Sequence, residues 1–300
     1  MLDVIIIGSG PAGLSAAIYA ARAGLSHKVI ERNPMSGGQI LQTYEVDNYP
    51  GLLHIAGFDM GMKFREHAEE LGAEFTEEEV LRIEDCKEYK KVITDQGSYE
   101  TKTIVFATGA HHAELNVPGE KELSGCGVSY CATCDGAFFK DKTVAVIGGG
   151  DVAVEDAIFL ARLCKQVYLV HRRDTLRAAK SLQKQLEAME NVTYEWNSEV
   201  SSIEGDSGVK GVKVKNTITQ GEKTLEVDGV FIAVGIHPDT ELLNGIVHMD
   251  DAGYVIAQED GESSCPGIYV AGDCRKKKLR QVITAAADGA NAIASVQEYI

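Results

Sequence analysis

Two cysteines separated by two residues are the part of this sequence best suited to chemistry. Cys131 and Cys134 enclose an alanine and a threonine, and Asp135 follows directly. In this spacing one thiolate can attack a disulfide while its neighbour resolves the mixed disulfide. An adjacent carboxyl group can give a proton to a leaving thiolate or take one from a thiol. The pattern predicts a dithiol redox centre in which Asp135 acts as acid or base, caps a helix, or does both.

A metal cluster is the main alternative for these sulfurs. Cys126, Cys131 and Cys134 have the C-x4-C-x2-C spacing of plant-type iron–sulfur proteins, and Cys164 follows further along. Cys164, however, falls at the end of a predicted helix, beyond a predicted strand and a glycine turn. It cannot easily return to a cluster loop, so we predict no metal site. The remaining cysteines are predicted to be ordinary buried or loop thiols: Cys86, Cys265 and Cys274.

A dithiol centre needs an electron donor, and the first of two glycine-rich turns indicates a nucleotide site. It joins a predicted strand at residues 3–7 to a predicted helix that ends near residue 23. The N–H groups of such a turn approach a pyrophosphate, and an acid at the end of the next strand bonds the ribose. The alternative is a turn that only joins strand to helix. The predicted binding residues are Gly8, Gly10, Pro11, Ala12, Gly13 and the acid Glu31.

The same unit recurs at residues 143–171, but the position of the acid has changed. His171 stands as far after the second glycine turn as Glu31 stands after the first, and arginines follow it. Guanidinium groups bind a 2′-phosphate that an acid would repel, so this turn is predicted to prefer NADPH. The alternative is a solvated basic surface. The predicted residues are Gly148, Gly150, Asp151, His171, Arg172, Arg173 and Arg177.

This internal repeat predicts an α/β fold with two Rossmann-like, three-layer dinucleotide-binding domains. Each copy closes with a strand, at residues 104–109 and 230–235. A third apolar strand at 267–273 precedes a helix at 281–299. If it completes the first domain, the second domain is an insertion. The predicted first domain is 1–113 with 239–300, and the predicted second domain, 114–238, carries the CxxC motif.

Two nucleotide sites in one chain pair most naturally as one flavin and one nicotinamide. Asp273 follows the last predicted strand directly, after Gly272. An acid in that position can bond the ribityl hydroxyls of a flavin, or else cap a helix. We therefore predict that the first domain binds FAD and the second binds NADPH.

Composition and charge exclude several other classes of protein. The chain has 300 residues, a formal net charge of −16 and seven cysteines. Such an acidic chain lacks the basic footprint for nucleic acid or anionic membranes. An odd cysteine count without an even ladder of spacings argues against a secreted disulfide framework. The N-terminal apolar run is too short for a signal peptide or a membrane span. We expect a cytoplasmic protein.

These motifs together resemble one family, the low-molecular-weight thioredoxin reductases. The resemblance covers the whole chain in order. The matching segments are 8–13, 37–39, 48–51, 107–109, 131–136, 148–151, 171–178, 272–273 and 280–281.

The resemblance implies that NADPH reduces FAD, that FAD reduces the cysteine pair, and that the pair reduces thioredoxin. It implies also that Cys134 faces the flavin, that Cys131 attacks the thioredoxin disulfide, and that the protein is a homodimer. The further flavin-site residues that it implies are Gly38, Gln39, Asn48, Gly109, Gly272, Asp273, Arg280 and Gln281.

The chain departs from the family pattern at three places. Val152 replaces a small hydroxyl residue, Cys126 stands where arginine is frequent, and residues 276–278 are three lysines. The valine is expected to soften contact with the nicotinamide nucleotide. The lysines are expected to form a solvated loop, with docking of an acidic partner as the alternative.

The dithiol and the NADPH site share one predicted domain, yet both must reach one flavin. We therefore expect residues 114–238 to rotate on two short linkers between two arrangements. Other enzymes with this core are a reductase serving another thioredoxin-like or peroxiredoxin-system partner, a ferredoxin-dependent relative and a dithiol oxidase using oxygen. A flavin-loaded redox sensor without turnover is the non-enzymatic alternative.

Overall fold

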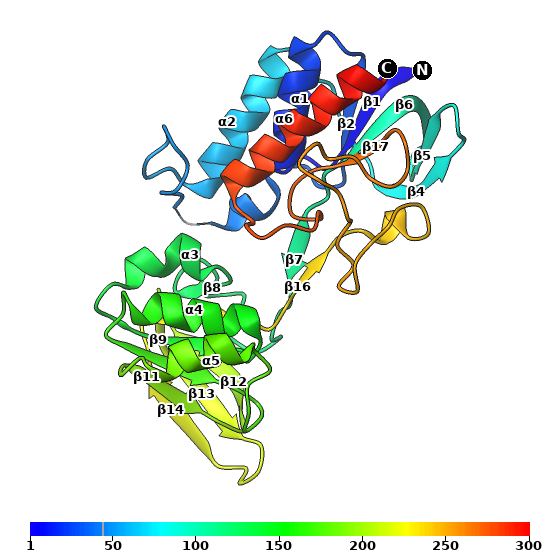
Figure 1. The fold of residues 1–300 in the computed structure, drawn as a ribbon. Helices are drawn as coiled ribbons and strands as arrows, with labels where there is room; N and C mark the ends of the chain where they lie inside the picture. Colours follow the sequence, from blue (N-terminus) through cyan, green and yellow to red (C-terminus); the bar gives the residue numbers. More distant parts are fainter. Residues whose placement is uncertain (44) are drawn as a thin grey trace. The chain divides into compact units, whose positions relative to one another are not determined.

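The computed structural model describes residues 1–43 and 45–300. They form two compact units, one of residues 1–111 with 237–300 and one of residues 112–236 (Figure 1). Both junctions lie two residues before the boundaries expected from the sequence. The α/β class expected from the two glycine turns is confirmed, because both units contain a parallel sheet.

The first unit is built on a sheet with five parallel strands. Their order is β3 (Phe75–Glu77), β2 (His27–Glu31), β1 (Leu2–Ile7), β6 (Ser98–Phe106) and β17 (Ile268–Val270). A hairpin of β4 (Val80–Asp85) and β5 (Lys90–Thr94) extends the sheet antiparallel to the start of β6. Because β17 pairs with β6, the second unit is inserted between strands of one sheet.

Alternation along β1 divides the core of this unit into two layers. Val4 and Ile6 pack against α1 (Pro11–Arg22) and α6 (Val282–Tyr299), which lie side by side (Figure 1). Ile5 and Ile7 pack against the segment around η3 (Glu241–Leu243). Successive side chains of a strand point to opposite faces, so an unbroken apolar run marks a strand buried on both sides. Two further helical elements, η1 (Gly38–Gln42) and α2 (Gly57–Glu70), contact each other.

The second unit repeats this plan with five parallel strands. Their order is β11 (Val192–Glu195), β10 (Gln166–Val170), β9 (Thr143–Ile147), β15 (Gly229–Ile232) and β8 (Val128–Ser129). One face packs on α4 (Asp151–Ala161) and α5 (Lys180–Glu187). The other face packs on an antiparallel sheet of β12 (Ser198–Gly205), β13 (Val209–Asn216) and β14 (Glu222–Glu226). Between β8 and β9 lie α3 (Ala132–Asp135) and η2 (Gly136–Phe139).

The chain passes between the units at two neighbouring strands. β7 (Ala110–His112) leads into the second unit, β16 (Ile236–Pro238) leads back, and the two pair as a two-stranded sheet. Among the described residues, no helix combines the length and the apolar character that a membrane span requires.

Candidate active site

The two central cysteines stand at the start of a short helical segment in the second unit. The Cys131 carbonyl accepts the backbone N–H groups of Cys134 at 3.2 Å and of Asp135 at 3.1 Å, which closes the first turn of α3. Cys131 and Cys134 form a disulfide. Their sulfurs therefore bond each other, as a dithiol redox centre requires. Cys126 is exposed and Cys164 is buried.

The carboxyl group of Asp135 is held by a hydroxyl group. Its Oδ2 accepts a 2.6 Å hydrogen bond from Ser129 Oγ, and its Oδ1 is buried without a hydrogen-bond partner. Burial raises the pKa of Asp135, and the hydrogen bond from Ser129 opposes that rise. Asp135 shows no capping bond to the backbone of η2, the element that follows it. The capping role considered from the sequence is therefore absent at this turn, whereas a proton-exchanging role fits the buried oxygen.

The short helix that contains the CxxC motif packs against the helix of the second glycine turn. A Cβ at Gly136 would lie 2.9 Å from the Phe159 ring and 3.0 Å from the Leu160 side chain, so this segment lies close to α4. Asp156 lies one turn earlier on α4, and burial raises its pKa to about 7. The segment after the CxxC motif therefore packs against α4.

The first glycine turn is shaped by close backbone approaches. Gly8 has φ of +97°, and a Cβ there would lie 2.5 Å from the Ala107 carbonyl oxygen. A Cβ at Gly13 would overlap the Gly8 carbonyl, so this glycine brings α1 against β1. Gly10, by contrast, has open space at its Cβ position, and Pro11 begins α1 where a missing N–H costs nothing. The open side of Gly10 is therefore where a ligand can approach the backbone.

Glu31 lies beside this turn, as the sequence predicted. Its Oε2 accepts hydrogen bonds of 2.8 Å from both the backbone N–H and the hydroxyl of Ser9. Its Oε1 accepts 2.9 Å and 3.1 Å bonds from Asn33. The carboxylate is therefore fixed at the carboxyl end of β2, next to the turn.

Of four further predicted residues in the first unit, Gly38 and Gln39 belong to η1, and Asn48 and Gly109 lie in loops. A Cβ at Gly38 would come within 3.3 Å of Gly10, which places η1 against the glycine turn. Gln39 donates a 2.5 Å bond to the Ala110 carbonyl, and Asn48 donates a 2.9 Å bond to the Gln281 side chain. Gly109 has φ of +79° and no atom near its Cβ position. The structure therefore brings Gly38 to the turn and links Asn48 with Gln281, although 233 positions separate that pair.

The loop after β17 contains an acid with an unused oxygen. Oδ1 of Asp273 is buried without a hydrogen-bond partner, and Lys277 Nζ lies 3.9 Å from it. Burial raises the pKa of Asp273. Arg280 stacks on the Tyr254 ring at 4.1 Å, and its Nε is also buried without a hydrogen-bond partner. Since buried polar atoms are normally hydrogen-bonded, these two atoms mark a place where a polar ligand fits.

Asp288 of α6, which the sequence did not single out, holds this loop in place. Its carboxylate accepts bonds of 3.0 Å from the Gly272 N–H, 2.8 Å from Arg275 and 2.8 Å from Lys277. The lysine side chain is only 8% exposed. The expectation that residues 276–278 form a solvated loop is therefore wrong for Lys277, because a buried carboxylate draws its ammonium group inward.

The second glycine turn is followed directly by an acid, Asp151, that bonds a neighbouring loop. A Cβ at Gly148 would collide with the Ala233 carbonyl, whereas Gly150 again has open space. Asp151 Oδ1 accepts a 2.7 Å bond from the Ala179 N–H, and the Arg177 N–H donates a 2.8 Å bond to the Gly149 carbonyl. Both bonds tie the loop that carries the arginines to the glycine turn.

His171 and the loop that carries the arginines adjoin Gly149 of the second glycine turn. The His171 ring is buried on Gly149, where any added Cβ would strike it, and its Nε2 has no hydrogen-bond partner. Burial lowers the pKa of His171, as do the neighbouring arginines. Arg172, Arg173 and Arg177 are exposed. The predicted residues of this site therefore lie on one turn and one adjoining loop.

Comparison with known proteins decides the family. A profile of the pyridine nucleotide-disulphide oxidoreductases matches residues 2–289. Thioredoxin reductase of Listeria monocytogenes is 46% identical over 99% of this chain and 93% of its own length, and that of Bacillus subtilis is 44% identical over 99% and 94%. The crystal structure of thioredoxin reductase from Streptococcus pyogenes superposes with a TM-score of 0.96, at 45% identity, over 100% of this chain and 98% of that one.

The chain belongs to the thioredoxin reductases of this family. The resemblance seen in the sequence motifs is thus confirmed. Membership of the thioredoxin reductases implies FAD and NADPH as cofactors.

The residues of both glycine turns fit these groups. In the first unit, the open side of Gly10 suits a pyrophosphate, and Oδ1 of Asp273, which has no hydrogen-bond partner, suits a hydroxyl donor. In the second unit, the open side of Gly150 and the arginines beside it suit a phosphorylated dinucleotide. Each unit of this thioredoxin reductase family member therefore offers one dinucleotide site.

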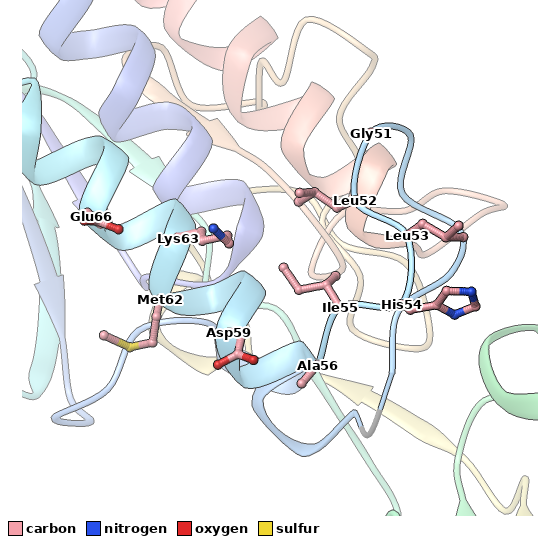
Figure 2. Close-up of a pocket in the computed structure, with 10 residues that line it drawn as sticks. All are labelled: Gly51, Leu52, Leu53, His54, Ile55, Ala56, Asp59, Met62, Lys63 and Glu66. Carbon is pink, nitrogen blue, oxygen red and sulfur yellow. The ribbon is translucent and has the colours of Figure 1, made fainter.

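The pocket drawn in Figure 2 is separate from all of these groups. It lies between the loop at residues 51–56 and the part of α2 from Asp59 to Glu66. Its lining contains none of the residues predicted from the sequence as catalytic or cofactor-binding. We therefore give it no part in the redox site.

Sequence reasoning missed three buried polar residues that hold the site. Ser129 bonds Asp135, Asp288 bonds the Asp273 loop, and Glu120 accepts bonds from the backbone at residues 115–117 and from the Tyr130 hydroxyl. An isolated serine or acid carries no spacing signal. For Ser129 alone, its place two residues before a CxxC motif could have drawn attention.

Proposed function

We propose that this chain is an NADPH-dependent thioredoxin-disulfide reductase. It moves two electrons from NADPH through FAD to the Cys131–Cys134 disulfide and from there to oxidised thioredoxin. The observation that carries the proposal is this disulfide, followed by a buried carboxyl group, in a chain of the thioredoxin reductase family. The thioredoxin partner comes from the names of the relatives at 43–46% identity.

We assign FAD to the first unit. The open side of Gly10 and the buried Asp273 oxygen without a hydrogen-bond partner support this assignment, and Glu31 is fixed beside the turn where a ribose would lie. Bound there, FAD would supply a two-electron carrier between NADPH and the sulfur pair. The proposed contacts are Gly8, Gly10, Pro11, Ala12, Gly13, Glu31, Gly38, Gln39, Asn48, Gly109, Gly272, Asp273, Arg280 and Gln281.

We assign NADPH to the second unit. The 2′-phosphate would be bound by exposed guanidinium groups that two hydrogen bonds keep close to the glycine turn. Asp151 would act through the loop, since its carboxylate bonds the Ala179 N–H. The proposed contacts are Gly148, Gly150, Asp151, His171, Arg172, Arg173 and Arg177.

Residues of the second unit are sufficient for the proposed exchange of sulfur bonds with thioredoxin. In the reduced state Cys131 is a thiolate, while Cys134 and Asp135 each carry one proton. Cys131 attacks thioredoxin, one thioredoxin sulfur leaves and takes the proton of Asp135, and a mixed disulfide remains. Cys134 then gives its proton to the Asp135 carboxylate and attacks Cys131. The second thioredoxin sulfur leaves with that proton, and the Cys131–Cys134 bond is restored.

The proposal includes a rotation of the inserted domain, residues 114–238. Two arguments support it. The sulfur pair and the proposed NADPH site belong to one unit and the proposed FAD site belongs to the other. The chain joins the units through the strands β7 and β16. Two short connections of this kind are suited to act as a hinge.

A cytoplasmic location and a homodimeric state complete the proposal. The location is inferred from the sequence, whose N-terminal apolar run is too short for a signal peptide or a membrane span, and the homodimer from the resemblance to the family. Light scattering on the purified protein measures the oligomeric state directly, and a monomer at working concentrations would contradict the homodimer.

The test of the proposed function is a comparison of Cys134→Ser with wild type. We expect purified Cys134→Ser to bind FAD and to let NADPH bleach the flavin absorbance under nitrogen. Reduction of thioredoxin should fall to background because no second thiol can resolve the mixed disulfide. Cys126→Ser, which removes an exposed cysteine outside the pair, is the control and should retain activity.

Three results would contradict the assignment. They are unchanged thioredoxin reduction by Cys134→Ser, a wild-type protein that takes up no FAD, and NADPH oxidation that depends on oxygen but not on thioredoxin. The last result would instead favour a dithiol oxidase.

A further inference from the structure

A buried serine just before the CxxC motif contacts both the acid and the backbone of the motif. Ser129 ends β8 and is 5% exposed. Its hydroxyl oxygen lies 2.6 Å from Oδ2 of Asp135 and accepts a 3.0 Å bond from the N–H of Cys131. The alternative acceptor for its proton, the Cys131 carbonyl, is 3.4 Å away. The short contact therefore takes the proton, and one hydroxyl group links the acid to the first redox cysteine.

This arrangement distinguishes the two oxygens of Asp135. Oδ2 is occupied by Ser129, while Oδ1 is buried and has no hydrogen-bond partner. A buried carboxyl oxygen without a partner is costly, and a catalytic role is one reason for a protein to retain it. The oxygen left over by Ser129 is thus the one that can carry a proton between sulfur atoms.

We propose that Ser129 is a positioning residue for proton transfer at the sulfur pair: by holding Oδ2 of Asp135 and the amide of Cys131, it reserves Oδ1 for exchange with the sulfurs. This inference rests on the proposed function, because it concerns the proton that Asp135 gives and takes there. In the first transfer the O–H bond at Oδ1 breaks as the leaving thioredoxin sulfur gains the proton. In the second, Oδ1 takes the proton of Cys134 and passes it on.

The direction of the pH effect follows from the contacts of Asp135. Burial raises the pKa of Asp135 and the Ser129 hydrogen bond lowers it. Loss of the hydroxyl should therefore raise that pKa further, so the carboxyl stays protonated to a higher pH. Other ionisable groups nearby are the two cysteines and, on α4, which packs against α3, Asp151, Glu155 and Asp156. All of them are unchanged by a substitution at Ser129, so a comparison of variants isolates Asp135.

The experiment compares Ser129→Ala with Ser129→Thr, which keeps the hydroxyl. Ser201→Ala is the control, because that serine lies in the same unit and its hydroxyl bonds only a carbonyl of β13. The first readout is the pH profile of thioredoxin reduction. The second needs no thioredoxin: the pH dependence with which iodoacetamide alkylates Cys131 and Cys134 in pre-reduced holoenzyme. Asp135→Asn identifies the inflection that belongs to Asp135 by removing it.

We expect that inflection to move to higher pH in Ser129→Ala in both readouts and to stay in place in Ser129→Thr and Ser201→Ala. Thioredoxin reduction by Ser129→Ala near pH 7 should fall about tenfold, less than the roughly 100- to 10,000-fold that a lost acid–base group costs, because Asp135 itself remains. Bleaching of the flavin by NADPH should change less than about twofold, because that step does not use the Asp135 proton. If Ser129→Ala does not fold, Ser129→Cys, a weaker donor, should show the same shift at smaller size.

An unmoved inflection in Ser129→Ala, or a Ser129→Thr variant as slow and as shifted as Ser129→Ala, would overturn the proposal and leave Ser129 a purely structural residue. Failure of the proposed function would look different. Wild type would then fail to reduce thioredoxin, while the alkylation curves would still test Ser129.

Discussion

At the scale of single residues, the end of the second strand in each nucleotide-binding repeat has different side chains in the two units. In the first unit it is Glu31, whose carboxylate is fixed by Ser9 beside the glycine turn. In the second it is His171, buried against Gly149 and followed by exposed Arg172 and Arg173. Both turns stand in the same order of strand, turn, helix and strand. Under the proposed function, the identity of these side chains therefore decides which ribose, plain or phosphorylated, is accepted.

Replacement of Arg172 by glutamate should therefore change nucleotide preference. A hydrogen bond between charged groups contributes about 1.5–3 kcal/mol, so we expect the KM for NADPH to rise about 10- to 100-fold with a smaller change in kcat. The KM for NADH should change little, because NADH lacks the phosphate. Steady-state kinetics with both nucleotides measure this. Arg162→Glu, at the exposed end of α4, is the control and should behave like wild type; equal losses with both nucleotides would contradict the role of Arg172.

At the scale of elements, the contact between the first and last helices supports the flavin site. Gly289 of α6 lies so close to α1 that a Cβ there would overlap the Ala12 carbonyl and come within 2.9 Å of the Ala16 nitrogen. The preceding residue, Asp288, bonds the Gly272 N–H and two cations of the Asp273 loop. One turn of α6 therefore positions both the glycine turn and the acid proposed to bind the flavin.

A methyl group at Gly289 should force these helices apart. Overpacking of a tight contact costs about 1–3 kcal/mol, and here the obstacle is backbone that cannot rotate away. We expect Gly289→Ala to lower Tm and to be purified with less bound FAD, measured by thermal denaturation and by the ratio of flavin to protein absorbance. Gly97→Ala is the matched control, since the Cβ position of Gly97 has open space and ordinary φ. Equal stability of the two variants would show that the helices separate without cost.

At the scale of the whole molecule, the chain consists of two units joined through a pair of short strands. The proposed NADPH and dithiol sites share one unit, so each must be brought in turn to the flavin site proposed in the other. If the sites are used as proposed, one unit must move relative to the other between half-reactions.

A covalent lock between the units should therefore stop turnover and spare one half-reaction. The experiment introduces one cysteine in each unit of oxidised Cys126→Ser enzyme and joins them with a bismaleimide. We expect steady-state thioredoxin reduction to fall at least about 100-fold, as for a disabled conformational step, while either flavin bleaching by NADPH or flavin oxidation by the disulfide continues in stopped-flow traces. Single-cysteine variants treated with the same reagent are the control. Normal turnover by the locked enzyme would refute the rotation.

Much of the site was predictable because its signals are local. The CxxC spacing, the glycine turns and the acid or arginines after the following strand all depend on neighbours within about 25 residues, as in any βαβ unit. Even the insertion was suggested by an apolar strand at 267–273, and the pairing of β17 with β6 agrees with it. The solvated lysine loop was a wrong expectation, because the partner of Lys277 lies on α6.

What the amino-acid order by itself determined is the chemistry: a redox-active cysteine pair, two nucleotide turns and the charge that separates their ligands. What only the tertiary structure decided is which buried groups support that chemistry. The bonds of Ser129 to Asp135, of Asp288 to the Gly272 loop and of Asn48 to Gln281 depend on side-chain direction and on how distant segments pack. None of these three bonds leaves a periodic pattern in the chain, because the role of a single polar residue depends on the partner that folding brings to it.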